Sequence, residues 1–505
     1  MRVASKFAMA LWIALRARAD SAACAPCHRE IYESYRRTAM ALTSGAVTNT
    51  RASDAFTHTA SGFSYRVRRD WLEFSKDAVQ GRKRLAWYIG SGAVARSYLV
   101  EDDGFLFEAP VAYYAAVGRW GLAPAYDQYA YPFVTRPIVP ACLNCHATAV
   151  SWQPGTLNRY ANPPFRENGI GCERCHGPGE DHAASGGTIV NPAKLSPDRR
   201  DSVCAQCHLS GEVRVTRRAQ PYQPGDRLSD SIAVFVRNGV TPAMRVTSHF
   251  EKLAQSACKR AARDRMWCGT CHDPHRAPTA AAVRAQCRNC HADTACKETA
   301  ANRARRRDDC IACHMPKSPV TDAQHVVYTD HSIPRRPRLA EAQQPLDELI
   351  AFAGTEASER DLALAYGIVA SRQDRTQRLL EAAAKGSPDD TEVLVSLAEI
   401  YRANGNYERA IPLYRRAIEL DPAQLTAPVG LGGILFERGQ FAEAIQLWQN
   451  ALTKNSGLVL VATNLAMAQW RTGDRLGAEA TLRKVIGLSP AFAPARDLLQ
   501  KLPRE

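Results

Sequence analysis

Residues 142–146 read CLNCH and residues 172–176 read CERCH, and the spacing of their cysteines and histidine decides how this chain is organised. The same pattern, Cys-x-x-Cys-His, recurs at 24–28, 204–208, 268–272, 287–291 and 310–314. Fourteen of the 16 cysteines in the 505-residue chain therefore belong to one repeated motif. The two residues between the cysteines differ from copy to copy, so the cysteines and the histidine carry the chemistry.

The motif is the attachment signature of c-type haem, in which two thiols bond to the porphyrin and the adjacent imidazole binds the iron. Zinc knuckles and thioredoxin-like redox pairs also use Cys-x-x-Cys, but neither requires a histidine at the next position. Because only 13 residues are histidine, seven chance repetitions are excluded, and the sequence predicts seven covalently attached haem c groups. The predicted attachment residues are Cys24, Cys27, Cys142, Cys145, Cys172, Cys175, Cys204, Cys207, Cys268, Cys271, Cys287, Cys290, Cys310 and Cys313. The predicted proximal iron ligands are His28, His146, His176, His208, His272, His291 and His314.

Histidines outside the motifs are candidates for the second, distal axial ligand of each iron. There are six of them: His58, His182, His249, His275, His325 and His331. If all six bind iron, six haems carry two imidazoles, and the seventh takes methionine, another group or nothing. Met40 is a candidate for that position, since methionine ligation would raise the reduction potential. The alternative for Met40 is packing in a helix core.

Two cysteines, Cys258 and Cys296, lie outside the motifs. In an oxidising compartment two such thiols either form a disulfide or stay free and buried. We expect the disulfide and keep the free thiols as the alternative.

The amino terminus, residues 1–19, resembles a secretory signal peptide, with basic residues, an apolar run over 7–15 and an Ala-x-Ala site at 17–19. Two arginines beside that site are unusual, so an amphipathic helix is the alternative. No later stretch has the 18 apolar residues of a membrane span. We therefore expect a periplasmic or outer-surface protein without a transmembrane anchor, consistent with haem attachment outside the cytoplasm.

The formal charge of +14, from 65 basic and 51 acidic residues, would by itself suggest a nucleic-acid partner. Each ferric haem with ionised propionates adds about −1, however, so seven haems neutralise much of the excess. We expect arginines to contact propionates and no nucleic acid to bind. The basic run 303–307 is expected to be a solvated face beside Asp308 and Asp309, with docking of an acidic partner as the alternative.

The predicted fold class is mainly α, and the haem domain covers residues 20–332. About residues 45–140, aromatic and β-branched runs predict a small antiparallel β insertion, with a hairpin turn at Asp102-Asp103-Gly104. Six motifs then fall between 142 and 314, where porphyrin faces replace an ordinary core. Residues 333–346 have the composition of a linker.

Residues 347–505 repeat with a period of 34, seen in Gly405, Gly439 and Gly473 and in the alanines five positions later. This is the period of the tetratricopeptide repeat, which stacks into an all-α superhelix with a concave peptide-binding face. The predicted repeats cover 357–390, 391–424, 425–458 and 459–492, and a capping helix follows. The repeats bind a protein or peptide partner, or they act as a structural arm.

Several stretches of this chain resemble the doubled CXXCH-motif family of multihaem cytochromes c, which is related to the tetrahaem electron acceptor of hydroxylamine oxidoreductase, in the branch with C-terminal tetratricopeptide repeats. The matching stretches are 88–92, 96–99, 172–182, 268–275, 310–317 and 325–331. The resemblance implies closely packed haem pairs with mostly bis-histidine ligation and a role in periplasmic electron transfer. It also implies His182, His275, His325 and His331 as distal ligands, with His249 and His58 as further candidates.

These features predict an electron-transfer protein whose repeats dock a redox partner, rather than a catalyst. The alternative is a multihaem oxidoreductase that acts on a small nitrogen or sulfur compound at one haem with an open axial position. The sequence has no Cys-x-x-Cys-Lys motif of the nitrite reductase kind.

Overall fold

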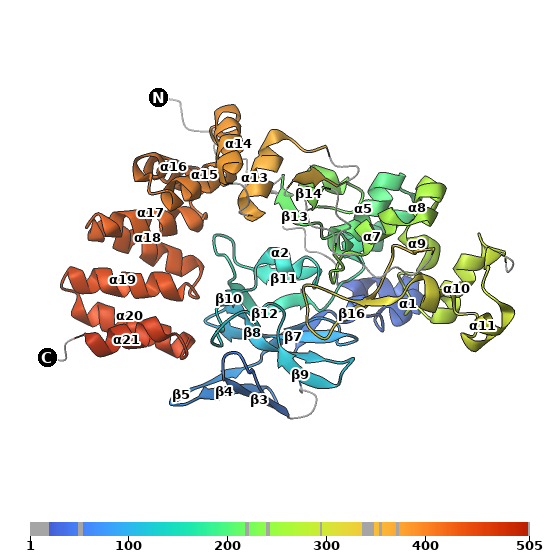
Figure 1. Cartoon of the computed structure of the whole chain (residues 1–505), viewed down its shortest axis with the longest axis horizontal. Coiled ribbons are helices and arrows are strands. Elements are labelled where there is room, and N and C mark those ends of the chain that lie inside the picture. Colours follow the sequence, from blue (N-terminus) through green and yellow to red (C-terminus); the bar gives the residue numbers. More distant parts are fainter. Residues whose placement is uncertain are drawn as a thin grey trace.

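The structure is a computed structural model that describes residues 20–48, 54–217, 222–238, 243–292, 295–335, 348–352, 356–369 and 373–502. The predicted signal peptide (1–19) and most of the predicted linker lie outside these residues. The described chain forms a body of sheets and short helices, flanked by a stacked row of helix pairs (Figure 1).

The largest element of the body is a six-stranded antiparallel sheet with the order β1-β6-β7-β8-β10, in which β9 also pairs with β8. Its strands are β1 (Ser44–Ala46), β6 (Trp87–Ile89), β7 (Ala95–Asp102), β8 (Phe105–Tyr114), β9 (Arg119–Leu122) and β10 (Arg136–Pro137). The β7–β8 turn places Asp103 and Gly104 at φ values of 50° and 78°, which is the hairpin turn that Asp-Gly favours. Nine of the ten residues of β8 are buried, because other elements cover both of its faces.

A second antiparallel sheet contains β2 (Asp54–Thr57), β3 (Ser64–Arg68), β4 (Trp71–Lys76) and β5 (Val79–Arg84). Alternate residues of β3 and β4 are buried, as expected of strands with one face on a core. Three smaller sheets complete the body. Their strands are β11 (Ala149–Trp152) with β12 (Tyr160–Glu167), β15 (Lys317–Pro319) with β16 (Val327–Thr329), and β13 (Val213–Thr216) with β14 (Ile232–Arg237) and β17 (Leu349–Ala351).

The prediction of a mainly α fold is only partly confirmed, because the chain has about 46% helix and 18% strand. Strand structure is not limited to residues 45–140: it continues through β12 and returns in β13–β17. Strand β17 also lies where only helix was predicted. Strand β17 pairs with β14, which lies far away in the chain, and a single sequence carries little signal for such pairing. The pairs β11–β12, β13–β14 and β15–β16 are local, but their strands are short and lie among the haem motifs.

Helices of the body are short, and most of them carry or flank a Cys-x-x-Cys-His motif. The α-helices are α1 (Ala25–Tyr35), α2 (Pro140–Leu143), α3 (Glu173–His176), α4 (Glu180–Ser185), α5 (Pro197–His208), α6 (Leu228–Ser231), α7 (His249–Gln255), α8 (Ala257–Ala262), α9 (Cys268–Cys271), α10 (Ala280–Arg288), α11 (Ala300–Arg305) and α12 (Cys310–His314). The 3₁₀ turns are η1 (Ser21–Cys24), η2 (Met40–Leu42), η3 (Pro192–Lys194) and η4 (Arg263–Arg265). Helices this short are not stable alone, so their packing must hold them.

The C-terminal row is built from helix pairs with the period seen in the sequence. Its helices are α13 (Glu359–Val369), α14 (Gln373–Gly386), α15 (Thr391–Ala403), α16 (Tyr407–Leu420), α17 (Thr426–Glu437), α18 (Phe441–Lys454), α19 (Val459–Arg471), α20 (Arg475–Leu488) and α21 (Ala493–Lys501). The repeated glycines lie in the turns within pairs at φ values of 73°, 75° and 88°, which glycine adopts without strain. Alanines five residues later are fully buried, and this allows the two helices of each pair to approach closely.

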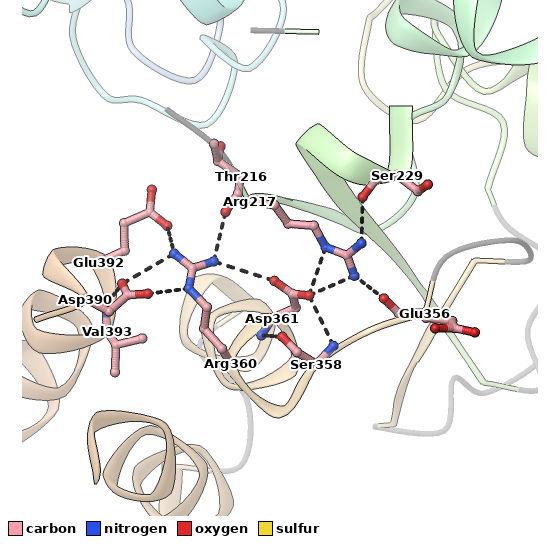
Figure 2. Close-up of polar contacts among 10 residues, drawn as sticks. All are labelled: Thr216, Arg217, Ser229, Glu356, Ser358, Arg360, Asp361, Asp390, Glu392 and Val393. Atoms are coloured by element: carbon pink, nitrogen blue, oxygen red, sulfur yellow. Dashed lines mark hydrogen bonds and ion pairs between the residues drawn. The ribbon is translucent and has the colours of Figure 1, made fainter. Parts of the chain in front are cut away.

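One end of the row is joined to the body through β17, which pairs with β14. The hydrophobic core continues from β13 and β14 into α13–α15 without interruption. Arg217 and Arg360 stabilise this junction with ion pairs (Figure 2). Arg217 pairs with Asp361 at 2.8 Å, and Arg360 pairs with Asp390 and with Glu392.

The other end of the row packs on β8. Phe105 and Phe107 of β8 form a buried cluster with Leu488 of α20. The backbone amide of Leu157 donates a 2.9 Å hydrogen bond to the carbonyl of Lys454 at the end of α18. The row is therefore attached to the body at both ends.

Candidate haem centres

The seven motifs occupy helix ends and short turns of the body. The third and fifth motifs lie largely in α3 and α9, the fourth ends α5, and the seventh forms α12. The second and sixth motifs begin in the last turn of α2 and α10 and continue beyond these helices, and the first begins at Cys24 and continues into α1. In the first motif the helix is interrupted at His28, whose φ and ψ of −119° and 38° are not helical. The motif side chains thus come from short helices and from the turns at helix ends.

Two motif histidines face a second imidazole in the geometry that one iron requires. The rings of His28 and His182 are 6.3 Å apart and inclined by 12°, and those of His176 and His275 are 6.0 Å apart and inclined by 16°. Two imidazoles bound to opposite sides of one metal have ring centres roughly 6 Å apart, since each metal–nitrogen bond is about 2 Å. Both pairs therefore fit a haem held between them.

A cluster of four further histidines lies around the fourth and fifth motifs. His272 and His331 have ring centres 6.2 Å apart, again the separation of an axial pair. His208 faces His249 at 5.2 Å with perpendicular rings, and His249 also touches His331 at 4.9 Å. This arrangement places two neighbouring haem sites within one histidine cluster.

Two other candidate ligands lie elsewhere. His325 packs edge-on against Tyr114, beside Arg119, on the exposed end of β9. The Nδ1 atom of His58 is hydrogen-bonded to the hydroxyl of Ser61, next to the β2–β5 sheet. The structure thus brings His182, His249, His275 and His331 to motif histidines, and it brings neither His325 nor His58 to one.

Backbone carbonyls orient several of these imidazoles. The Nδ1 atom of His176 lies 2.8 Å from the carbonyl of Val190, and that of His182 lies 2.6 Å from the carbonyl of Gly187. His331 and His314 make similar contacts, at 2.9 Å and 3.0 Å. Because a carbonyl only accepts, each Nδ1 donates a proton and Nε2 presents its lone pair to a metal. Sequence reasoning could not find these carbonyls, because any residue type supplies one.

Burial favours the neutral form of several of these imidazoles, and the neutral imidazole is the form that binds iron. Burial and the neighbouring histidines lower the pKa of His249 to about 3. Burial likewise lowers the pKa of His146 and of His208. Their Nδ1 atoms, like that of His249, are buried without a hydrogen-bond partner.

Cysteines of different motifs lie next to each other. The thiol of Cys24 is within hydrogen-bonding reach of Cys172, which joins the first and third motifs in space. Cys145 reaches Cys207, and Cys204 reaches Cys268. The second motif therefore lies next to the fourth, and the fourth lies next to the fifth. The expected disulfide between the two non-motif cysteines is not formed, since both are free thiols.

The segment around the sixth and seventh motifs lacks a protein core. Among its described residues, 273–292 and 295–313, no side chain is buried. A chain segment cannot stay ordered without burying apolar surface. Two covalently attached porphyrins, with their broad apolar faces, would supply that surface, so these residues fit the group that the motifs predict.

A metal site made of protein side chains alone is absent from the described part of the chain. No three or more of its His, Cys, Asp or Glu side chains are placed together so that they could hold a metal ion by themselves. A haem iron needs fewer protein ligands, because the porphyrin nitrogens fill its other coordination positions. None of the described helices combines the length and the apolar character needed to cross a bilayer.

In its motifs and in the arrangement of these centres the chain resembles multihaem c-type cytochromes, and tetratricopeptide repeats follow at its C-terminal end. The family model for cytochrome c554 and c-prime matches residues 131–177, which include the second and third motifs. Tetratricopeptide-repeat models match 371–424, 395–458 and 459–484. The resemblance predicted from the sequence is thereby confirmed.

Among curated proteins, the chain is similar to multiheme cytochrome MtrA of Shewanella baltica, with 27% identity over 180 residues, which is 30% of this chain and 52% of that protein. It is also similar to cytochrome c-554 of Nitrosomonas europaea, with 31% identity over 99 residues, 16% of this chain and 41% of that protein. This chain thus spans about half or less of each of these relatives. A crystal structure of MamA aligns with a TM-score of 0.26 and 22% identity, and the alignment covers 27% of this chain and 80% of that one.

Proposed function

We propose that this protein is an exported, periplasmic electron carrier, with one haem c on each of its seven motifs and with tetratricopeptide repeats that hold a redox partner. The observation that carries the proposal is the set of imidazole pairs 6.0–6.3 Å apart at the first, third and fifth motifs. Haem supplies a one-electron carrier when it is bound. The chain's own residues orient it and exclude other ligands.

A haem bound between two of these imidazoles would have both remaining iron positions taken by the protein, which would suit electron transfer and not substrate binding. The carbonyls of Val190, Gly187 and Thr329 hold their imidazole partners in one tautomer and one orientation. The imidazoles therefore reorganise little when an electron arrives or leaves.

The distal ligands interlock the motifs along the chain. His182 follows the third motif and faces the first, His275 follows the fifth and faces the third, and His331 follows the seventh and faces the fifth. Each distal ligand thus comes from a stretch two motifs further on. This ties the segments of the first, third, fifth and seventh motifs together and supports a relay among their haem sites.

A protein partner is proposed for the repeats because the family of this domain binds peptides in its grooves. An open groove of about 530 Å³ lies on the surface between α14, α15 and α16. Its lining includes Lys385, Tyr401 and Arg409 and the carboxylates of Glu381 and Glu408. Such a mixed lining suits a polar peptide segment.

A second candidate, an oxidoreductase that binds a small nitrogen or sulfur compound at an open haem, has one observation in its favour. Among the described ring contacts, His146, His291 and His314 are not paired with another imidazole. Iron at these motifs is where such a substrate would bind.

The test is the purified protein from a host that attaches haem c. We expect its mass to exceed that of the peptide by seven haems, and electron paramagnetic resonance to show mostly low-spin iron. A colourless protein with the mass of the bare peptide would refute the proposal. A high-spin signal that shifts with nitrite or hydroxylamine would favour the second candidate.

Substitution of His182 by alanine tests the ligand pairs directly. We expect His182→Ala to convert one low-spin haem to high-spin, because the first iron loses its second imidazole. The matched control is His325→Ala, which removes an imidazole of the same size that packs against Tyr114 and Arg119 and, among the described ring contacts, faces no motif histidine. A spectrum unchanged by His182→Ala, or changed equally by both variants, would show that the pairing is wrong.

A further inference from the structure

Helices α10, α11 and α12 form a lobe at the edge of the molecule, described over residues 276–292 and 295–314. In Figure 1, α10 and α11 project from the body on the side opposite the helical repeats. The lobe carries the sixth and seventh motifs, and its Cys290 and Cys310 are exposed. The end of the motif series therefore lies on an open surface.

The lobe is strongly basic. Between residues 276 and 314 the sequence has eight Lys or Arg residues and four acidic residues, Asp293, Glu298, Asp308 and Asp309. Two ferric haems with ionised propionates would add about −1 each. Positive charge therefore remains in excess after both haems are attached.

The acidic residues beside the arginine run neutralise only part of it. Asp308 pairs with Arg303 at 2.7 Å. Asp309 is occupied as the cap of α12, where its carboxylate accepts hydrogen bonds from the amides of Ile311 and Ala312. Of the two aspartates beside the predicted solvated face, Asp308 forms the ion pair with the arginine run and Asp309 caps a helix.

The remaining arginines lie close to the haem-attachment residues. Arg306 places a guanidinium nitrogen 3.2 Å from the Sγ atom of Cys313. Arg284, on the helix of the sixth motif, donates a hydrogen bond to the carbonyl of Arg307. The side chains of Arg305 and Arg307 are exposed and form no ion pair with a carboxylate in the described part of the lobe. One basic surface therefore borders both motifs.

We propose that this lobe is an electron port, where the sixth and seventh haems exchange electrons with a redox protein whose docking face is rich in carboxylates. The inference rests on the proposed function, since it needs haem on both motifs. One electron passes between the partner's centre and a haem iron, which changes between ferric and ferrous, and no bond forms or breaks. An anionic lipid surface would also attract the positive charge. Exposed haem-attachment residues matter only for electron transfer, however, so they favour a redox protein as the partner.

The experiment measures how fast a reduced plant-type [2Fe–2S] ferredoxin, an acidic one-electron donor of low potential, reduces the oxidised full-length holoprotein in a stopped-flow instrument. The port variant is Lys297→Glu/Arg305→Glu/Arg307→Glu, which leaves Arg306 and its contact with Cys313 unchanged. We expect its second-order rate constant to be about tenfold or more below that of the wild type at low salt, and the difference to vanish at high salt.

The control is Arg378→Glu/Arg471→Glu/Lys484→Glu, which changes the net charge equally with exposed residues of the repeats. We expect a change of less than about twofold, because these residues are far from the lobe. Equal rates for port variant and wild type, or equal losses in both variants, would overturn the proposal. The neutral variant Lys297→Gln/Arg305→Gln/Arg307→Gln keeps the test valid if the charge-reversed protein does not fold. We expect its second-order rate constant at low salt to lie between the values expected for the wild type and the port variant.

Haem loss and lipid binding are distinguished from an electron port by three further measurements. The masses of the peptides around 287–291 and 310–314 show whether both haems are present; if they are absent, the proposed function fails as well. A port variant that loses haem while the wild type keeps it would show that these residues hold propionates, which overturns the port. Salt-sensitive binding to phosphatidylglycerol vesicles that the port variant loses, with an unchanged ferredoxin rate, would assign the surface to lipid and also overturn it.

Discussion

Glu108 is a carboxyl group buried in the middle of β8, with a side chain only 10% exposed. Its Oε2 atom lies 3.0 Å from a guanidinium nitrogen of Arg136, on β10. Burial raises the pKa of Glu108 to about 7, and the nearby Arg136 opposes that rise only in part. The folded protein therefore holds this proton more tightly than the unfolded chain does.

The sign of the pH dependence follows from that shift. Below the unfolded pKa of about 4.5 the contribution of Glu108 to stability is fully present, and it is lost as the pH rises through 7. The full effect would be about 3 kcal/mol for this shift. We expect Glu108→Gln to be more stable than the wild type at pH 8, by about 1–2 kcal/mol, and less pH-dependent between pH 5 and 8. Urea unfolding at several pH values measures this.

The control for Glu108→Gln is Glu419→Gln on the exposed surface of α16. Its side chain is 65% exposed, so we expect a change within about 0.5 kcal/mol at every pH. A Glu108→Gln protein with the pH profile of the wild type would show that this carboxyl is already ionised near pH 5.

At the level of elements, the junction between β13–β14–β17 and α13 determines how the repeats are attached. The hydroxyl of Tyr366 in α13 accepts a hydrogen bond from the amide of Leu349 at the start of β17. Arg217, at the end of β13, donates to Asp361, whose side chain is 4% exposed (Figure 2). The strand and the helix therefore form one packed unit, and the first repeat is continuous with the body.

Arg217→Ala should destabilise the protein by about 1–3 kcal/mol, because the buried carboxylate of Asp361 loses its 2.8 Å partner and keeps only the more distant guanidinium of Arg360, at 3.5 Å. We expect this as a lower midpoint in thermal unfolding of the holoprotein. Arg483→Ala is the comparison, since Arg483 forms an exposed i,i+4 pair with Glu479 and its loss should cost less than about 0.5 kcal/mol. Similar midpoints for the two variants would mean that the junction is not held by this ion pair.

On the scale of the whole molecule, the repeats are attached to the body at both ends. The second attachment brings Gly457, in the loop before α19, against the buried ring of Phe107 on β8. A Cβ atom at Gly457 would lie 2.5 Å from Cε1 of that ring. The close approach exists only because residue 457 has no side chain.

Gly457→Ala should therefore push the fourth repeat off β8 and cost about 1–3 kcal/mol. Hydrogen exchange should become faster in α19, α20 and α21, and this is the measurement that locates the effect. Gly433→Ala is the control, because a Cβ atom there meets nothing within 4 Å, and alanine in a helix is neutral or stabilising by up to about 1 kcal/mol. Equal exchange rates in the two variants would show that the second attachment does not form.

The sequence by itself determined the cofactor chemistry and the repeats. The Cys-x-x-Cys-His motif acts within five residues, and the 34-residue period acts within one helix pair, so both are readable without knowing which segments meet. The strand runs and the Asp102-Asp103-Gly104 turn were predictable for the same reason, because turn and strand propensities are local.

Only the tertiary structure decided which spare histidine faces which motif, where the extra strands pair, and how the repeats attach to the body. His182 and His325 look alike in the sequence, yet one faces His28 and the other lies on Tyr114. Likewise β17 is three residues that acquire their role only beside β14. The physical reason is that axial ligation, sheet pairing and domain packing join residues far apart in the chain, and their energies depend on the contacts that the folded backbone brings together.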